Sequence, residues 1–260
     1  MSKERNGDRP LGARSLIASL LLRSQPPRMR AARLVQWCGL FGVAEGAARV
    51  ALSRMLDRGE LHTVDGMYEL AGRVGARRQT QDWSLAPGVE KWDGRWRMAV
   101  VDGGARTAAD RSALREVMRR LRYAGVREGV WTRPDNLPRA SGPNESWDVA
   151  DEQCQWWDSE PDRDSRALAE SLFAVSTWVA SARRATRTLG ASARGLAKGS
   201  ERALADAFIA GASALAVIRL DPLLPAELGE STRVGNELRA AYHEYEAAIT
   251  PAIRTWFRSH

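Results

Sequence analysis

Residues 44–70 have the sequence AEGAARVALSRMLDRGELHTVDGMYEL, and this stretch decides the first part of the fold. From Ala44 to Arg58 apolar side chains recur at helical spacing, and charged or polar side chains fill most of the other positions. A glycine follows as a helix stop. The short runs Leu61–Val64 and Met67–Leu70 flank Asp65-Gly66, a dipeptide favoured in tight hairpins. The stretch therefore predicts an amphipathic helix followed by a β-hairpin.

Two further helices are expected upstream of this stretch. Ser15–Leu22 is a short apolar helix, and Pro26-Pro27 ends the connection so that Met29–Cys38 can form a second one. The order helix, helix, turn, helix, hairpin is that of a winged helix-turn-helix, whose third helix enters the major groove of DNA. A small helical bundle capped by a hairpin gives the same pattern and is the alternative.

The excess of positive charge lies entirely in this N-terminal part. The chain of 260 residues holds 39 basic and 32 acidic residues, a formal net charge of +7. Residues 1–80 hold 14 basic and 7 acidic residues, whereas residues 81–260 hold 25 of each. A basic module joined to a neutral body is typical of a nucleic-acid reader with a regulatory or dimerising remainder. Charge segregation therefore favours DNA, with an anionic membrane surface as the competing partner.

Composition and motifs argue against several classes of protein. No run approaches the 18 apolar residues of a membrane span, and the leader MSKERNGDRPLGARS lacks a secretory pattern. Cys38 and Cys154 are far apart, which suggests neither a disulfide framework nor a thiolate metal site. GxSxG, P-loop and GxGxxG motifs are lacking as well. We therefore expect a cytoplasmic protein that is not an enzyme and has no cofactor.

A mixed α/β segment is expected in the middle of the chain. Residues 71–91 have the composition of a linker. Arg95–Val101 and Val126–Thr132 are predicted strands on either side of a helix over Asp110–Tyr123, a β-α-β unit of ferredoxin-like type. Four arginines follow the polar side of that helix: Arg111, Arg115, Arg119 and Arg122. They form either a phosphate-facing surface or, more commonly, a solvated face.

The rest of the chain is predicted to be helical. Residues 140–165 form an acidic connecting segment whose three tryptophans must pack onto something. Long helices are then expected at Arg166–Leu189, Glu201–Ile218 and Thr232–Ile249. The predicted fold class is α+β. It combines a winged helix-turn-helix over residues 13–72, a ferredoxin-like, Cas2-like domain over residues 90–139, and an all-helical domain over residues 160–258.

Three blocks of sequence resemble the PaaX-like family of bacterial transcriptional repressors. RLVQWCGLFGVAEGAARVALSRMLDRGEL (33–61) is similar to that family's DNA-reading unit. WDGRW (92–96) and EGVWTRP (128–134) are similar to its Cas2-like middle domain, and RLDPLLPAEL (219–228) is similar to a motif of its helical domain. The resemblance implies a homodimeric, ligand-responsive repressor on an inverted-repeat operator. It also implies that an aryl-acyl-CoA thioester, such as phenylacetyl-CoA, releases the DNA.

The chain departs from that family at the hairpin. Members usually carry a large aromatic residue at the position of Glu60, and their wing is longer and more basic. Asp65 at the wing tip should repel phosphate. The recognition helix is therefore the stronger candidate for DNA contact.

The residues expected to reach base edges lie on the helix predicted at 44–58. They are Glu45, Arg49, Val50, Ser53 and Arg54. Arginine can fork onto guanine, glutamate can accept from cytosine N4, and valine can touch a thymine methyl. Arg49 is the first choice, while Ser53 and Arg54 have ordinary helical roles as alternatives. The residues expected to bind phosphates flank this surface and are Arg28, Arg30, Arg33, Arg58 and His62.

An effector of the implied kind needs cations for its phosphates and an apolar slot for its acyl group. Arg183, Arg184 and Arg187 are candidates for the first role. Trp156 and Trp157 are candidates for the second. Surface arginines on a helix are the alternative explanation.

The alternative function is a metal-dependent nuclease that uses the Cas2-like middle domain. Asp102 ends a predicted strand where Cas2-type nucleases carry a metal-binding aspartate, and a dimer could pair two such carboxylates. Plain turn chemistry before Gly103-Gly104 is the more ordinary explanation. A third possibility is a helical interaction protein that does not bind DNA.

Overall fold

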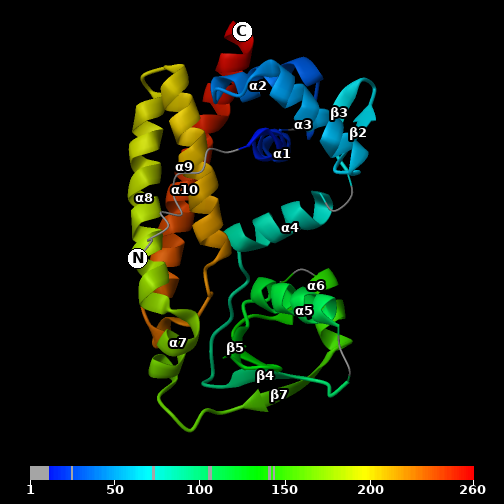
Figure 1. Ribbon diagram of the computed structural model, residues 1–260. Coiled ribbons are helices and arrows are strands. Elements are labelled where there is room, and N and C mark those ends of the chain that lie inside the picture. Colours follow the sequence, from blue (N-terminus) through cyan, green and yellow to red (C-terminus); the bar gives the residue numbers. More distant parts are fainter. Residues whose placement is uncertain (1–11, 25, 72–73, 105–106, 140–141, 143) are drawn as a thin grey trace, which may run out of the picture. The chain divides into compact units, whose positions relative to one another are not determined.

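The chain folds into two compact units. The computed structural model describes residues 12–24, 26–71, 74–104, 107–139, 142 and 144–260. Unit 1 comprises the described parts of residues 1–78, together with residues 191–212 and 246–260. Unit 2 comprises the described parts of residues 79–190, together with residues 213–245. Each unit thus combines segments that are far apart in the sequence (Figure 1).

Unit 1 begins with a winged-helix arrangement. Its elements are α1 (Ala13–Arg23), β1 (Arg28–Met29), α2 (Ala31–Leu40), α3 (Glu45–Asp57), β2 (Leu61–Val64) and β3 (Met67–Leu70). The strands form an antiparallel sheet in the order β1-β3-β2. Asp65 (φ 50°) and Gly66 (φ 71°) occupy the two central turn positions, as a type I′ hairpin requires. The predicted helices and hairpin are confirmed.

One boundary in this part was wrong. The sequence pattern placed Met29 at the start of a helix, but α2 begins at Ala31. Arg28 and Met29 instead form β1, opposite Glu69 and Tyr68 of β3. Pairing with the outer edge of β3 satisfies backbone groups that a two-stranded hairpin would leave open, and this tertiary gain outweighs the local helical pattern.

The core of unit 1 joins the N-terminal helices to two distant helical segments. These belong to α9 (Glu201–Arg219) and α10 (Ser231–Ser259). Trp37 of α2 is completely buried. Its ring lies 4.9 Å from that of Phe208 and 5.7 Å from that of Trp256, both in edge-on geometry. Arg23 adds an ion pair to Glu246 at 2.6 Å.

Unit 2 contains a four-stranded antiparallel sheet with ferredoxin-like connectivity. Its elements are β4 (Trp96–Val101), α5 (Ala108–Arg120), β5 (Ala124–Arg127), β6 (Val130–Pro134), α6 (Asn144–Asp151) and β7 (Cys154–Ser159). The strand order is β5-β6-β4-β7. The order β-α-β-β-α-β with the first strand in the middle of the sheet is the ferredoxin-like pattern. α5 packs on the sheet through Leu114, Val117 and Met118.

Three expectations for this region need correction. The single strand predicted over 126–132 is a hairpin, because Gly129 (φ 75°) allows a turn between β5 and β6. The acidic segment at 140–165 is not only a connection, since it supplies α6 and β7. Asp148, Asp151 and Asp158 are exposed, whereas Cys154 and Trp156 pack on the core, so the acidic composition of the segment gave no indication of the strand. The linker predicted at 71–91 contains α4 (Val74–Leu85).

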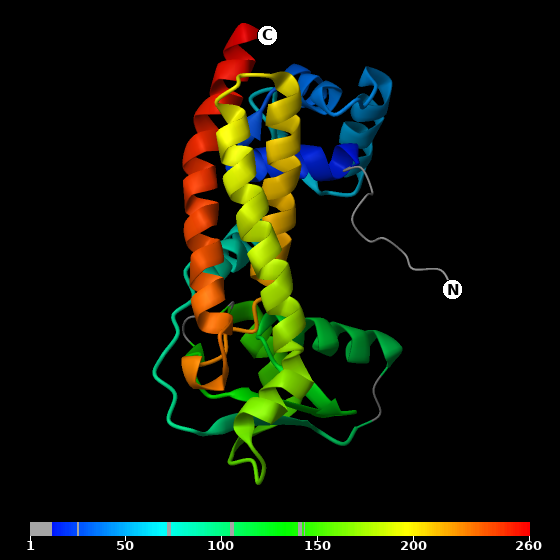
Figure 2. The same ribbon diagram turned by 90° about the vertical axis from the view of Figure 1, so that its left-hand side faces the viewer.

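The helical segments of unit 2 come from α7 (Ser165–Phe173), α8 (Val175–Leu196), α9 and α10. The last three run side by side in both views (Figures 1 and 2). Trp178 of α8 donates from Nε1 to the carbonyl oxygen of Val217 at 3.0 Å. The helix predicted over 166–189 is interrupted at Ala174 (φ 47°), a left-handed residue. α10 continues beyond the predicted end at Ile249, through Pro251.

None of the helices in the described residues combines the length and apolar character that a membrane span requires.

Candidate nucleic-acid interface

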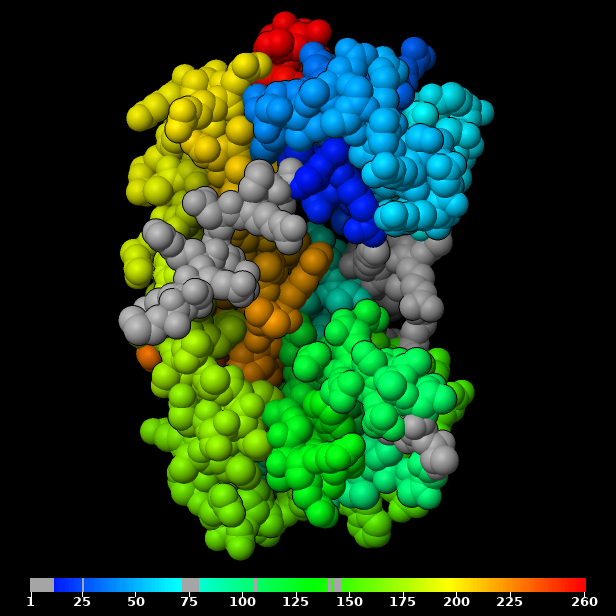
Figure 3. Space-filling view, in the orientation of Figure 1, coloured from blue at the N-terminus to red at the C-terminus, as the bar shows by residue number. Residues whose placement is uncertain are grey.

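α3 turns one side toward the core and the other toward solvent. Ala48, Leu52 and Met55 are buried against the rest of the winged helix. The residues predicted to contact bases are all exposed: Glu45, Arg49, Val50, Ser53 and Arg54. In the space-filling view the segment from α2 to the hairpin, light blue to cyan, forms part of the visible surface (Figure 3). The face expected to read DNA is therefore accessible in unit 1.

Arg49 is held by a weak partner. Its Nη2 lies 2.7 Å from Glu45 Oε1, and the two side chains are 60% and 66% exposed. An exposed pair of this i,i+4 kind contributes roughly 0.3–0.5 kcal/mol, so Arg49 can exchange it for another acceptor at little cost. Val50, one position further along, is 49% exposed and offers an apolar contact beside the two charges.

The predicted phosphate-binding residues differ in their surroundings. Arg30, Arg33, Arg58 and His62 are exposed. The Arg33 guanidinium lies 5.4 Å from the centre of the Phe257 ring, and His62 Nε2 lies 3.8 Å from Glu69 Oε2. These contacts leave most of the cationic surface open to solvent.

Arg28 is less exposed than the other four, and it forms an ion pair with Asp65 at the tip of the wing. Its Nη1 lies 3.9 Å from Asp65 Oδ2, and its Nε is buried with no hydrogen-bond partner in the described part of the chain. The carboxylate of Asp65 therefore has a cation beside it. Glu60, at the start of the hairpin, accepts from Arg14 Nε at 2.6 Å and ties the wing to α1.

The two tryptophans predicted to hold the acyl group of an effector lie on opposite faces of the sheet. Trp156 and Trp157 are consecutive in β7, so their side chains lie on opposite faces of the sheet. Trp156 packs against Tyr123 and Trp147 with ring centres 5.4 Å away from each. Trp157 is 54% exposed on the other face. The two indoles therefore do not line the same face of the sheet, and a role of either in effector binding stays a prediction.

The arginines predicted to hold the effector's phosphates lie on α8. Arg183, Arg184 and Arg187 are all exposed. Arg183 Nη2 lies 2.6 Å from Glu230 Oε2, which is itself shared with Arg233. A role of these arginines in effector binding stays a prediction.

Asp102 lies directly after β4 in a turn. Its backbone N–H donates to the carbonyl of Gln153 at 3.0 Å, and its own carbonyl accepts from Gly104 N–H at 2.9 Å. Its side chain is exposed. Among the described residues, no group of three or more His, Cys, Asp or Glu side chains is placed to hold a metal ion.

Sequence reasoning missed a buried polar cluster in unit 2. We call it the arginine cluster, and its members are Arg122, Arg133, Asn136, Asp221 and Arg239. Arg133 Nη2 donates to Asn136 Oδ1 at 2.7 Å and to the carbonyl of Leu223 at 3.2 Å. These bonds join the EGVWTRP block to the DPLLP block. Burial lowers the pKa of Arg133 to about 10, which still leaves it charged at neutral pH.

Asp221 is the carboxylate of the arginine cluster. Its Oδ2 accepts from Arg239 Nη2 at 2.7 Å, and its Oδ1 accepts from the N–H of Leu223 at 2.9 Å. Burial raises the pKa of Asp221, while the charge of Arg239 lowers it. A Cβ at Gly235 would lie 2.5 Å from Asp221 Oδ2, so glycine is needed at that position. In the sequence, the signal for this cluster was the DPLLP motif that begins at Asp221.

Comparisons with known proteins agree with these elements. The family model described as PaaX-like protein matches residues 12–74, and the model described as PaaX protein central Cas2-like domain matches residues 89–146. Among solved structures, the uncharacterized protein Rv0674 from Mycobacterium tuberculosis is 32% identical, with a TM-score of 0.69. That match covers 94% of this chain and 98% of the other. No protein with a curated description matches.

The two family models fall on the winged helix and on the ferredoxin-like sheet, in the order in which the resembling blocks occur. The relative of known structure extends the similarity through the C-terminal helices. The predicted fold class is confirmed: a PaaX-type N-terminal part, a Cas2-like middle part and a helical C-terminal region. The chain therefore belongs to the PaaX-like family, whose members are typically transcriptional repressors.

Proposed function

We propose that this protein is a transcriptional repressor that reads an inverted-repeat DNA operator through α3. The observation that carries the proposal is the solvent-facing side of α3, on which five side chains suited to base contacts lie opposite the buried side. An α-helix fits the major groove, where each base pair presents a distinct pattern of donors and acceptors. Membership of a family of repressors supports the same function.

The side chains of α3 suit different partners in the groove. Arg49 can donate two parallel bonds to guanine O6 and N7, and Glu45 can accept from cytosine N4. Val50 can contact a thymine methyl group. Glu45 and Arg49 form an ion pair with each other in the free protein. On a G·C pair this ion pair would be replaced by two contacts, from Arg49 to guanine and from cytosine N4 to Glu45.

A homodimer and an effector complete the proposed mechanism. One helix in one groove gives modest affinity, and two copies related by a two-fold axis can occupy the two half-sites of an inverted repeat. The family resemblance supports an aryl-acyl-CoA thioester as the effector. Addition of phenylacetyl-CoA to the protein–DNA complex is expected to release the DNA, and release measured equally with free coenzyme A would argue against recognition of the acyl group.

Arg49→Ala is expected to weaken binding to the selected operator by about 1–3 kcal/mol, roughly 5- to 150-fold, because it removes a bidentate base contact. The operator is first obtained by selecting bound fragments from a random duplex pool. Affinity of the variant is then measured by gel shift on that operator and on a scrambled duplex. Binding to the scrambled duplex should change much less.

Arg202→Ala is the matched control for this experiment. Arg202 is also an exposed arginine in an i,i+4 pair, with Asp206, but it lies on α9. Equal losses in the two variants would show that Arg49 acts only through net charge, and would argue against base reading by α3. DNA cleavage in the presence of magnesium that disappears in Asp102→Ala would favour the nuclease alternative.

Arg58→Ala is expected to weaken binding to every duplex by a similar factor, because a phosphate contact carries no sequence information. Its clearest signature is the salt dependence. Loss of one neutralised phosphate should make the slope of log K against log salt shallower by about 0.9. Arg49→Ala serves as the comparison, and an Arg58→Ala variant that altered the selected sequence instead would contradict this assignment.

A further inference from the structure

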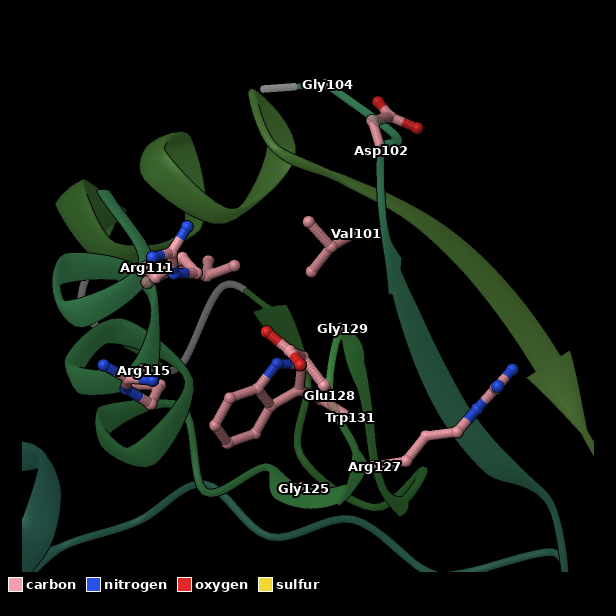
Figure 4. Close-up of a pocket in the computed structure, with 11 residues that line it drawn as sticks. Val101, Asp102, Gly104, Arg111, Arg115, Gly125, Arg127, Glu128, Gly129 and Trp131 are labelled. Carbon is pink, nitrogen blue, oxygen red and sulfur yellow. The ribbon is translucent and has the colours of Figure 1, made fainter. Parts of the chain in front are cut away.

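A cavity in unit 2 lies between α5, the end of β4 and the β5–β6 hairpin. Its volume is about 670 Å³, within the range of roughly 300–1,000 Å³ that small-molecule sites occupy. Val101, Leu114 and Trp131 supply apolar lining, while Arg111 and Arg115 line it from α5. Figure 4 shows these arginines on one side and the indole of Trp131 across from them, next to the carboxylate of Glu128.

From this arrangement we infer that the cavity binds a small phosphorylated ligand with a planar ring, of which a nucleoside diphosphate is the simplest form. The inference does not depend on the proposed reading of DNA, because the cavity belongs to unit 2 and α3 belongs to unit 1. Arg111 and Arg115 belong to the row of arginines along α5, which forms either a solvated face or a phosphate-facing surface.

The charged residues that line the cavity are Asp102, Arg111, Arg115, Arg127 and Glu128. The two arginines that α5 supplies point to an anion with more than one negative charge. Arg111 and Arg115 are one helical turn apart on α5, so their guanidinium groups line the same side. Within the described residues Arg115 forms no ion pair, whereas Arg120 on the same helix pairs with Glu116 at 3.1 Å. A single carboxylate is satisfied by one bidentate arginine, while neighbouring phosphate groups can engage two.

The opposite side of the cavity suits the organic part of such a ligand. The Trp131 indole is partly exposed and rests on Gly125, where a Cβ would lie 3.6 Å from the ring. An indole face stacks on a purine or pyrimidine ring. Glu128 can accept from an N–H or O–H of the base or sugar. Arg127 also lines the cavity, but its side chain extends to the side away from Arg111 and Arg115 (Figure 4).

The concave shape favours a small molecule over the backbone of duplex DNA. A rod-like duplex presents its phosphates to open surfaces, whereas here apolar residues form part of the wall behind the arginines. Binding of duplex DNA by Arg111 and Arg115 would therefore overturn the inference.

Isothermal titration calorimetry of the full chain with ADP tests the site. We expect one ADP per chain, bound more tightly than either adenosine or inorganic pyrophosphate, since each of these lacks one half of the recognised groups. Arg115→Ala should weaken ADP binding about tenfold or more, the effect of losing a charge-assisted hydrogen bond. Trp131→Leu should weaken it as well, and Trp131→Phe should restore most of the affinity if stacking is the cause.

Arg119→Ala is the matched control, because Arg119 is an exposed arginine one turn further along α5 and outside the cavity lining. It should leave ADP binding unchanged. Absence of ADP binding, equal losses in Arg115→Ala and Arg119→Ala, or equal affinity for ADP and pyrophosphate would each overturn the inference. The inference would also be overturned if duplex DNA competed with ADP for binding and Arg115→Ala abolished that competition. Operator binding by Arg115→Ala should otherwise equal that of the wild-type protein.

Discussion

Replacing Trp37 by alanine is expected to lower the free energy of unfolding by about 3–5 kcal/mol, the usual effect of truncating a fully buried tryptophan. Trp37 has no exposed surface. Besides Phe208 and Trp256, its ring lies 5.3 Å from that of Phe41 and 5.9 Å from that of Phe257. The cavity left by alanine would remove apolar contacts with α9 and α10 together, so α2 would lose its main attachment to those segments.

Urea unfolding followed by far-ultraviolet circular dichroism measures this loss. Trp157→Ala is the control, because the same side chain is removed from a position that is 54% exposed. The control should change stability by about 0.5 kcal/mol or less if its surroundings are ordinary surface. Similar midpoints for the two variants would show that the aromatic cluster around Trp37 is not a main source of stability in unit 1.

The parts of the fold that sequence reasoning predicts well are those with strong local signals. α3 begins and ends within one residue of the predicted boundaries, because its buried positions repeat at helical spacing up to the glycine that ends it. The hairpin follows from Asp65-Gly66, since few other dipeptides adopt two successive positive φ values easily. The residues of α3 that are not at the buried, helically spaced positions form its exposed face. The candidate base-reading residues could therefore be chosen from the sequence alone.

Elements held by distant contacts were harder to predict. β7 looks like an acidic loop in the sequence, but its pairing with β4 and the burial of Cys154 and Trp156 make it a strand. The same alternation places Trp156 and Trp157 on opposite faces of the sheet, which their neighbouring positions in the sequence do not reveal without the strand assignment. Ala174 ends α7 in a left-handed conformation that alanine seldom adopts, so no local signal indicated that break.

The arginine cluster shows why recognisable motifs need not be surface sites. Two of its members come from blocks that resemble the family: Arg133 lies in β6, and Asp221 follows α9. Asn136 Nδ2 and Arg133 Nη2 both donate to the carbonyl oxygen of Leu223, at 2.9 and 3.2 Å. Leu223 has a positive φ of 52°, so these bonds hold the backbone in a conformation that it would not otherwise prefer. The motifs therefore fix the sheet to the helical part of unit 2.

Asp221→Ala is expected to destabilise the protein by about 3–5 kcal/mol, because it leaves the charge of Arg239 buried without its partner. Asp221 is 2% exposed and Arg239 is 7% exposed. Arg239 Nε would still donate to the carbonyl oxygen of Ser84 at 2.9 Å, but this neutral acceptor cannot compensate the charge of the guanidinium. Arg122 lies in the same cluster, so the variant would also bring buried cations together without a carboxylate.

Urea unfolding distinguishes this effect from that of an ordinary ion pair. Arg233→Ala is the matched control, because Arg233 is on α10 like Arg239 but pairs with Glu230 and Glu237 at the surface. The control should lose about 0–1 kcal/mol. The double variant Asp221→Leu with Arg239→Met should recover most of the stability lost in Asp221→Ala, since neither charge then remains buried. If the double variant is as unstable as Asp221→Ala, the hydrogen bond of Asp221 to the Leu223 backbone, and not the unpaired cation, is the larger contribution.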